Sequence, residues 1–116
     1  VVPEGKPFDA PVVQCALFRA ASLVDGDDFT LILFSGPDES GPSGKGRSDL
    51  RLRYSTDETA TWHDGPLIHV GPAAYSDMVR LKKGQFGILF ESGSKGKKRY
   101  DRIEFVRFSL DQLNIK

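Results

Sequence analysis

The octapeptide Ser55-Thr56-Asp57-Glu58-Thr59-Ala60-Thr61-Trp62 separates two β-rich segments of the chain. The segment before it, Leu50–Tyr54, alternates apolar and charged residues, which predicts a strand with one buried face. The segment after it, Pro66–Val70, predicts a second strand. Ser and Asp side chains bind local backbone N–H groups in turns, so Ser55 and Asp57 are expected to fix the turn between these strands.

Short β-rich segments punctuated by turns continue on both sides of this octapeptide. The expected strands are Val12–Phe18, Phe29–Phe34, Leu50–Tyr54, Pro66–Val70, Tyr75–Leu81, Gln85–Glu91 and Tyr100–Phe108. Gly71-Pro72 divides them into a group of four and a group of three. Serial four-stranded antiparallel sheets are typical of β-propeller blades, although the strand pattern alone fits a β-sandwich equally well. One helical turn is expected at Ser109–Leu113, and no long helix.

Several local expectations accompany these strands. The run Phe29–Phe34 barely alternates and is expected to be buried on both faces, and the Gly-, Pro- and Ser-rich segment Ser35–Gly46 is expected to be a loop. In the last strand the inward residues are expected to be Ile103, Phe105 and Val106, and the outward ones Arg102, Glu104 and Arg107. A turn is expected at Lys82-Lys83-Gly84, and a solvated hairpin tip at Lys95, Lys97, Lys98 and Arg99.

Composition narrows the possible functions. The 116 residues allow one small domain, and 16 Lys and Arg balance 16 Asp and Glu, which argues against nucleic acid as a partner. The longest apolar runs are too short to span a membrane. The lone Cys15 is expected to be a buried, inert thiol, and His63 and His69 to be structural or exposed, so neither a metal nor another cofactor is expected. The start at Val1 lacks a Met and a signal-peptide pattern, so we expect it to lie inside a longer protein.

The octapeptide resembles the Asp-box, Ser-x-Asp-x-Gly-x-Thr-Trp, which sialidases and some other propellers carry between the third and fourth strands of a blade. Ser55, Asp57, Thr61 and Trp62 match the box, whereas Thr59 stands where the box has Gly. Gly serves a positive φ there, a conformation that is costly for a β-branched residue, so a strained turn is expected. The resemblance implies a structural role for the box, with Trp62 packed beneath the turn.

A second segment carries a more specific resemblance. The run Gly71-Pro72-Ala73-Ala74-Tyr75-Ser76-Asp77-Met78, followed by Gly87-Ile88-Leu89-Phe90-Glu91, resembles the sialidase pattern Ala-Tyr-Ser-Asp-Leu, a turn, and Gly-x-Leu-Tyr/Phe-Glu. The resemblance implies that Tyr75 is the catalytic nucleophile and that Glu91 orients an arginine of the first blade. Their separation of 16 residues (91 − 75) suits adjacent antiparallel strands.

A third match concerns the binding of the substrate carboxylate. Sialidases place the third arginine of a carboxylate-binding triad after a loop that opens like Phe34-Ser35-Gly36-Pro37, and the spacing favours Arg47 over Arg51 and Arg53. Sialic acid carries a carboxylate on its anomeric carbon, so a neutral phenol avoids the repulsion that an Asp or Glu nucleophile would meet. Arginine pairs with such a carboxylate through two parallel hydrogen bonds.

The resemblance covers the chain from about Pro11 to Leu113. It implies an all-β fold, the C-terminal portion of a six-bladed β-propeller made of about two four-stranded antiparallel blades. Residues 1–116 would all belong to this part of the catalytic propeller, with the penultimate blade at about 11–70 and the last blade at 72–113. The acid/base Asp, the Glu partner of Tyr75 and the other two triad arginines would lie in upstream blades, so the isolated segment is expected to be inactive.

The function implied is that of an exo-α-sialidase, a retaining glycoside hydrolase that releases terminal sialic acid from glycans or glycoproteins. Two alternatives stay open at this point: a non-catalytic propeller that binds carbohydrate or protein, and a trans-sialidase. The expected partners are sialylated glycoconjugates and the upstream blades, with neither nucleic acid nor a membrane span. The resemblance alone points to a secreted, periplasmic or lysosomal setting.

Overall fold

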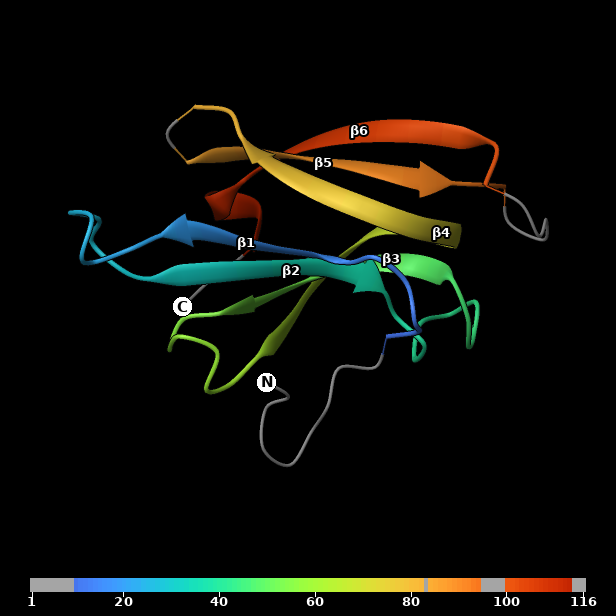
Figure 1. The fold of residues 1–116 in the computed structure, drawn as a ribbon, viewed down its shortest axis with the longest axis horizontal. Helices are drawn as coiled ribbons and strands as arrows, with labels where there is room; N and C mark the ends of the chain where they lie inside the picture. Colours follow the sequence, from blue (N-terminus) through green and yellow to red (C-terminus); the bar gives the residue numbers. More distant parts are fainter. Residues whose placement is uncertain (1–9, 83, 95–99, 114–116) are drawn as a thin grey trace.

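The computed structural model describes residues 10–82, 84–94 and 100–113. These residues form six antiparallel strands and a terminal 3-10 turn, and each strand pairs with its sequence neighbours (Figure 1). The elements are β1 (Ala16–Ala21), β2 (Leu31–Pro37), β3 (Ser48–Ser55), β4 (His63–Arg80), β5 (Gln85–Ser92), β6 (Arg102–Ser109) and η1 (Leu110–Leu113). This sequential order is the meander of propeller blades, whereas an immunoglobulin-type sandwich uses Greek-key connections.

Strand β4 belongs to two sheets at once. Its first part pairs with β3, from Tyr54↔His63 to Ser48↔Pro72, and its second part pairs with β5, from Ala73 to Arg80. The strands therefore form a group of four, β1–β2–β3–β4, and a group of three, β4–β5–β6, which Figure 1 shows as two layers. The expected division into four and three is confirmed, but the fourth and fifth expected strands are one continuous strand.

The hydrophobic core lies between these two layers. The β1–β4 group contributes fully buried Leu31, Leu33, Leu50 and Leu52, and the other group contributes Phe86 and Ile88. The Phe86 ring meets Phe18 of β1 edge-on, with ring centroids 5.8 Å apart. Such aromatic contacts add to the burial of apolar area, which is the main force that holds the layers together.

The N-terminal strands begin later than the sequence predicts. Strand β1 starts at Ala16 rather than Val12, whose side chain is 95% exposed. Strand β2 starts at Leu31 and runs to Pro37, so the predicted loop from Ser35 is wrong for its first three residues. The reason is pairing: Ser35, Gly36 and Pro37 lie opposite β3, which itself begins two residues before Leu50.

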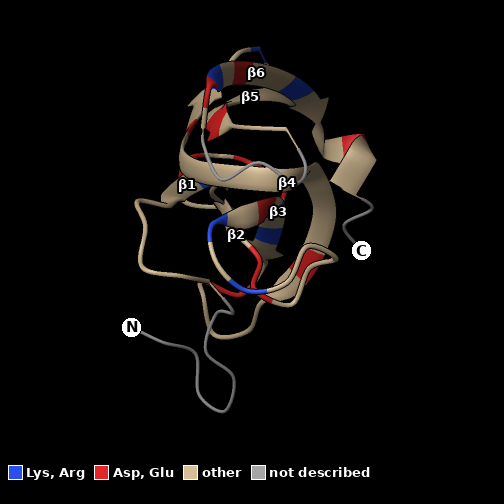
Figure 2. Cartoon of the chain, turned by 90° about the vertical axis from the view of Figure 1, so that its right-hand side faces the viewer, with Lys and Arg blue, Asp and Glu red and all other residues tan. Residues whose placement is uncertain are grey.

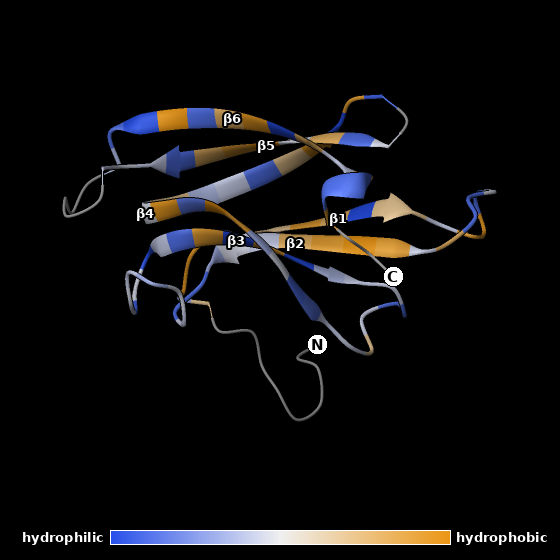
Figure 3. Cartoon of the chain, turned by 180° about the vertical axis from the view of Figure 1, so that it is seen from behind, coloured by the Kyte–Doolittle hydropathy of each residue, from blue (hydrophilic) through white to orange (hydrophobic). Residues whose placement is uncertain are grey.

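The prediction for the faces of β6 is confirmed for Val106, which packs against the core, and for Arg102 and Arg107, which are exposed. It is wrong for Ile103, Phe105 and Glu104. Ile103 and Phe105 are 72% and 49% exposed, while Val106 is half-buried and Phe108 is 6% exposed. Alternate residues of a strand share a face. Val106 and Glu104 therefore lie on the same face of β6 as the buried Phe108. Figure 3 shows hydrophilic and hydrophobic positions alternating along β6. The predicted helical turn is confirmed as η1.

Within residues 10–82, 84–94 and 100–113, the charged residues do not gather into one basic surface. Figure 2 shows acidic and basic positions interspersed over the strands and loops. No helix among the described residues is long and apolar enough to cross a membrane. The predicted basic hairpin tip, Lys95, Lys97, Lys98 and Arg99, lies outside the described residues, as does Lys83 of the predicted turn.

Replacement of Gly65 by Ala should destabilise the fold by about 1–3 kcal/mol, because overpacking a closed backbone contact forces strands apart. A Cβ at Gly65 would lie 2.6 Å from the backbone carbonyl oxygen of Leu52 on β3. Val70→Ala in the same strand is the control, since Val70 is 42% exposed. Urea unfolding of both variants checks this, and equal midpoints for the two variants would contradict it.

Candidate active site

Tyr75 lies on β4 where the ladder with β5 is irregular. The pairing shifts register between Ala73 and Ser76, as in a β-bulge. The Tyr75 backbone N–H donates to Oε1 of Glu91 at 3.2 Å, and the Tyr75 side chain is 49% exposed. Bulges commonly redirect side chains and are frequent beside active sites. The structure thus brings together two of the three predicted site residues.

Arg47 approaches the same segment through its backbone. Its carbonyl oxygen accepts a hydrogen bond from the Ala73 N–H at 2.9 Å, two residues before Tyr75. Its exposed guanidinium donates to the carbonyl of Val12 at 2.9 Å. Within the described ranges, Arg47 forms no ion pair with a carboxylate. Its charge is therefore not neutralised by those parts of the chain.

The two competing arginines have a different environment. Arg51 and Arg53 both pair with Asp38, whose side chain is 4% exposed. Burial by itself would raise the pKa of Asp38, but the hydrogen bonds from Arg51 and from the Ser40 N–H, with the charge of Arg53, leave that pKa lowered. Both arginines therefore serve a buried ion-pair cluster that ties the end of β2 to β3.

Two buried polar residues, Ser76 in the segment of β4 around Tyr75 and Asp49 in contact with that segment, were not predicted. Ser76 contacts Ser35 of β2 through their hydroxyl oxygens, 2.8 Å apart. Asp49, which is fully buried with a φ of 63°, accepts a hydrogen bond from the Gly71 N–H at 2.9 Å. Because both residues are polar, the sequence gives no sign that they are buried. The one available signal is that Asp tolerates the positive φ found at Asp49.

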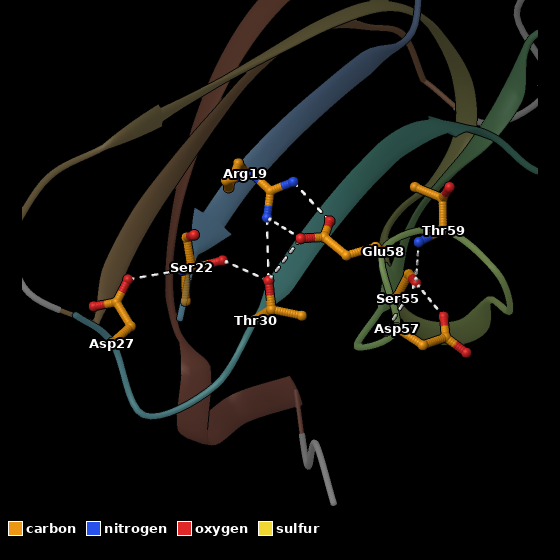
Figure 4. Close-up of polar contacts among 9 residues, drawn as sticks. Arg19, Ser22, Asp27, Thr30, Ser55, Asp57, Glu58 and Thr59 are labelled. Carbon is orange, nitrogen blue, oxygen red and sulfur yellow. Dashed lines mark hydrogen bonds and ion pairs between the residues drawn. The ribbon is translucent and has the colours of Figure 1, made fainter. Parts of the chain in front are cut away.

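The octapeptide 55–62, which connects β3 to β4, forms a loop held by its own side chains (Figure 4). Ser55 accepts a hydrogen bond from the Thr59 N–H at 2.9 Å, and Asp57 accepts one from the Thr61 N–H at 2.8 Å. The Ser55 hydroxyl also donates to Asp57 at 2.8 Å. The half-buried Trp62 meets Phe34 of β2 edge-on at 6.3 Å. These contacts close the loop and fix it to the sheet.

The loop contains two residues in the left-handed region of φ. Thr59, at the position where an Asp-box has Gly, has a φ of 72°, and Glu58 has a φ of 56°. The Glu58 carboxylate binds Arg19 of β1 through two hydrogen bonds of 3.0 and 2.7 Å (Figure 4). This exposed pair links the loop to the far edge strand of the same sheet.

The remaining sequence candidates are placed as follows. Cys15 is half-buried rather than buried, and burial raises the pKa of its thiol, which disfavours the reactive thiolate. His63 stacks on Tyr54 at 5.2 Å, and Nε2 of His69 lies 3.1 Å from the carbonyl of Gly93. In the part of the chain that the structure describes, no group of three His, Cys, Asp or Glu side chains is placed to hold a metal ion.

Comparison with known proteins finds sialidases similar to this chain. Sialidase-3 of Bos taurus is 35% identical over 109 residues, which cover 87% of this chain and 24% of that protein. Sialidase-2 of Mus musculus is 33% identical over 91 residues, which cover 72% of this chain and 21% of that protein. No protein-family profile matches the chain.

A solved structure shows the same fold at lower sequence identity. The intramolecular trans-sialidase from Ruminococcus gnavus, in complex with oseltamivir carboxylate, superimposes with a TM-score of 0.62 at 19% identity. The superposition covers 90% of this chain and 23% of that one. The chain is thus an all-β segment with the architecture of part of a β-propeller.

Over most of its length, the chain matches the sialidase family. It spans about a quarter of the length of the relatives it matches, at 24% and 25% of the first two.

Thr59→Gly should stabilise the fold by about 0.5–1 kcal/mol, because the left-handed strain on a β-branched residue exceeds the extra entropy that Gly loses on folding. Thr56→Gly in the same loop is the matched control, since Thr56 does not have a positive φ. Thermal unfolding of the two variants is the measurement. A Thr59→Gly midpoint below that of the wild type would overturn the account of strain.

Asp57 should contribute stability that is lost in acid. Hydrogen bonds from the Thr61 side chain and backbone and from Ser55 lower the pKa of Asp57 from 3.8 to about 2. The unfolded chain therefore binds more protons between these values, so this contribution is present above about pH 4 and disappears as the pH falls through about 2. Unfolding of wild type and Asp57→Asn should converge across that window. A difference that is constant from pH 5 to pH 2 would exclude this role.

Proposed function

We propose that this chain is the C-terminal part of a sialidase β-propeller, with the penultimate blade at about 11–70 and the last blade at 72–113. Together with the upstream blades, it would release terminal sialic acid from glycans or glycoproteins with retention of configuration. The observation that carries the proposal is that the segments containing Tyr75, Glu91 and Arg47 are hydrogen-bonded to one another. Tyr75, Glu91 and Arg47 are joined by hydrogen bonds at Tyr75 and Ala73.

Tyr75 has the features required of a nucleophile. Its side chain is half exposed on a bulge of β4, while its backbone is held by Glu91. Within the described residues, no group hydrogen-bonds to the Tyr75 hydroxyl, which leaves it open to a general base from another blade. A phenol is a weak nucleophile at its free pKa of about 10, so such a base is required.

Arg47 and Glu91 fit the remaining roles in this part of the site. Arg47 is exposed and makes no described ion pair, and its guanidinium, which donates to the Val12 carbonyl, has further N–H donors that could pair with the substrate carboxylate. The competitors Arg51 and Arg53 are already paired with Asp38. Glu91 uses Oε1 for the Tyr75 N–H, which leaves Oε2 to orient an arginine of the first blade.

The proposed reaction has two displacements. The Tyr75 oxygen bonds to the anomeric carbon while the glycosidic C–O bond breaks; the phenol proton goes to the upstream Glu, and the upstream Asp protonates the leaving oxygen. Water then attacks the same carbon from the face the leaving group vacated, giving up its proton to that Asp, and the bond to Tyr75 breaks, with its oxygen reprotonated by that Glu. Two inversions give net retention. A neutral phenol suits this carbon because the neighbouring carboxylate repels an anionic nucleophile.

The outer face of the last sheet supports the proposal that upstream blades pack here. Leu89, Phe105 and Ile103 of β5 and β6 are 48%, 49% and 72% exposed, and Val79 of β4 is 46% exposed. Their registers place them on one face of three adjacent strands. Contiguous exposed apolar surface of this kind marks a contact site. The isolated chain is accordingly expected to be inactive.

The test is sialidase activity of the full-length protein on a fluorogenic sialoside. Tyr75→Phe should lower kcat by about 10³-fold or more, because it removes the nucleophile of a covalent mechanism. Tyr54→Phe is the matched control, since Tyr54 stacks on His63 away from Tyr75 and should retain activity. The isolated chain should show no turnover.

Full activity of Tyr75→Phe would overturn the assignment of the nucleophile. A folded full-length protein that binds sialosides without hydrolysing them would favour a non-catalytic propeller. Transfer of sialic acid to an acceptor instead of water would identify a trans-sialidase.

A further inference from the structure

We propose that Asp49 is a positioning residue that holds Arg47 in place relative to Tyr75. The inference rests on the proposed function, since it assigns to Arg47 the binding of the substrate carboxylate. Asp49 lies on β3, two residues after Arg47, and its side chain is fully buried. A buried carboxylate needs strong hydrogen-bond donors to offset the loss of its hydration.

Asp49 satisfies both carboxylate oxygens with backbone donors from two different segments. Oδ2 accepts from the Ser43 N–H at 2.6 Å, in the loop that leads to Arg47. Oδ1 accepts from the Gly71 N–H at 2.9 Å, in β4. Hydrogen bonds from N–H groups to a charged acceptor are stronger than neutral ones. One side chain therefore joins the Arg47 loop to the strand that carries Tyr75.

The ladder explains why Gly71 needs this partner. The pairing of β3 with β4 shifts register between Ser48 and Leu50, and Gly71 has a φ of 116°. At the next irregularity of β4, the Tyr75 N–H is taken by Glu91 in the same way. Between the two carboxylates lies Ala73, whose N–H donates to the Arg47 carbonyl at 2.9 Å. Asp49 thus fixes one end of the segment 71–75, and Glu91 fixes the other.

The close packing around Asp49 restricts its movement. Its backbone carbonyl accepts from the Asp38 N–H at 2.9 Å. A Cβ at Gly41 would lie 2.5 Å from Oδ2 of Asp49, so the loop backbone passes directly over the carboxylate. The φ of 63° at Asp49 is one that Asp and Asn adopt more readily than other side chains. Asn can therefore replace Asp49 with little backbone strain.

The test uses Asp49→Asn in the full-length protein. The amide keeps the shape but turns one acceptor into a donor that faces a backbone N–H, so one of the two links breaks. We expect the KM for a fluorogenic sialoside to rise about tenfold while kcat changes less than about threefold, as for loss of a binding interaction. Asp27→Asn is the matched control, because Asp27 accepts a backbone N–H from Ser22 at 2.8 Å in a distant turn (Figure 4).

A double-mutant cycle separates positioning from general destabilisation. If Asp49 acts through Arg47, adding Asp49→Asn to Arg47→Ala should raise KM by less than about twofold. An equal further rise in that background, or a wild-type KM for Asp49→Asn alone, would refute the proposal. Should Asp49→Asn fail to fold, Gly41→Ala applies the same test, because its Cβ would displace Oδ2 of Asp49.

Hydrogen exchange distinguishes failure of this inference from failure of the proposed function. Asp49→Asn should speed amide exchange in both 40–48 and 70–76, whereas Asp27→Asn should affect only its own turn. Faster exchange in both segments of a protein that shows no sialidase activity would support the positioning role and reject the proposed function. Unchanged exchange in 70–76 would reject the positioning role whatever the activity.

Discussion

Strand β4 is the constraint on which the rest of the structure depends. It pairs with β3 through its first part and with β5 through its second, so one continuous backbone belongs to both sheets. A regular strand would direct its side chains alternately to two fixed faces, but β4 shifts register repeatedly. At these irregularities, charged side chains of the neighbouring strands satisfy the backbone: Arg51 donates to the Gly65 carbonyl, Asp49 accepts from Gly71, and Glu91 accepts from Tyr75.

Along β4, the residues that hold the fold and the residue proposed for the chemistry lie at different parts of the strand. The Asp-box loop lies at the start of β4, where Ser55 and Asp57 close it and Glu58 ties it to Arg19. Tyr75 lies on the later part, at the boundary of the two sheets. Two of the polar contacts that fix this boundary are buried, Ser35 with Ser76 and Asp49 with Gly71. Buried polar contacts specify a unique geometry because any displacement leaves a group unsatisfied.

Much of the fold could be predicted because strands and turns leave local signals. The group of four, the group of three and the terminal turn followed from β-rich runs, Gly and Pro. The faces of β6 could not, because Ile103 and Phe105 are as apolar as Val106 and Phe108, and only packing on the other layer decides between the two faces. The roles of Tyr75, Glu91 and Arg47 came from a family resemblance, and they stay predictions. The role of Asp49 could not be predicted because its partners are backbone N–H groups, 6 and 22 residues away, which leave no side-chain signal in the sequence.

The most direct test of the account is to trap the covalent intermediate on the full-length protein. A fluorinated sialosyl fluoride slows breakdown of the sialosyl-enzyme, and peptide mass spectrometry then locates the added mass. The account predicts a single label on Tyr75, in the peptide that contains the register shift of β4 between Ala73 and Ser76. A label on another residue of an active enzyme, or turnover with inversion and no label, would contradict it.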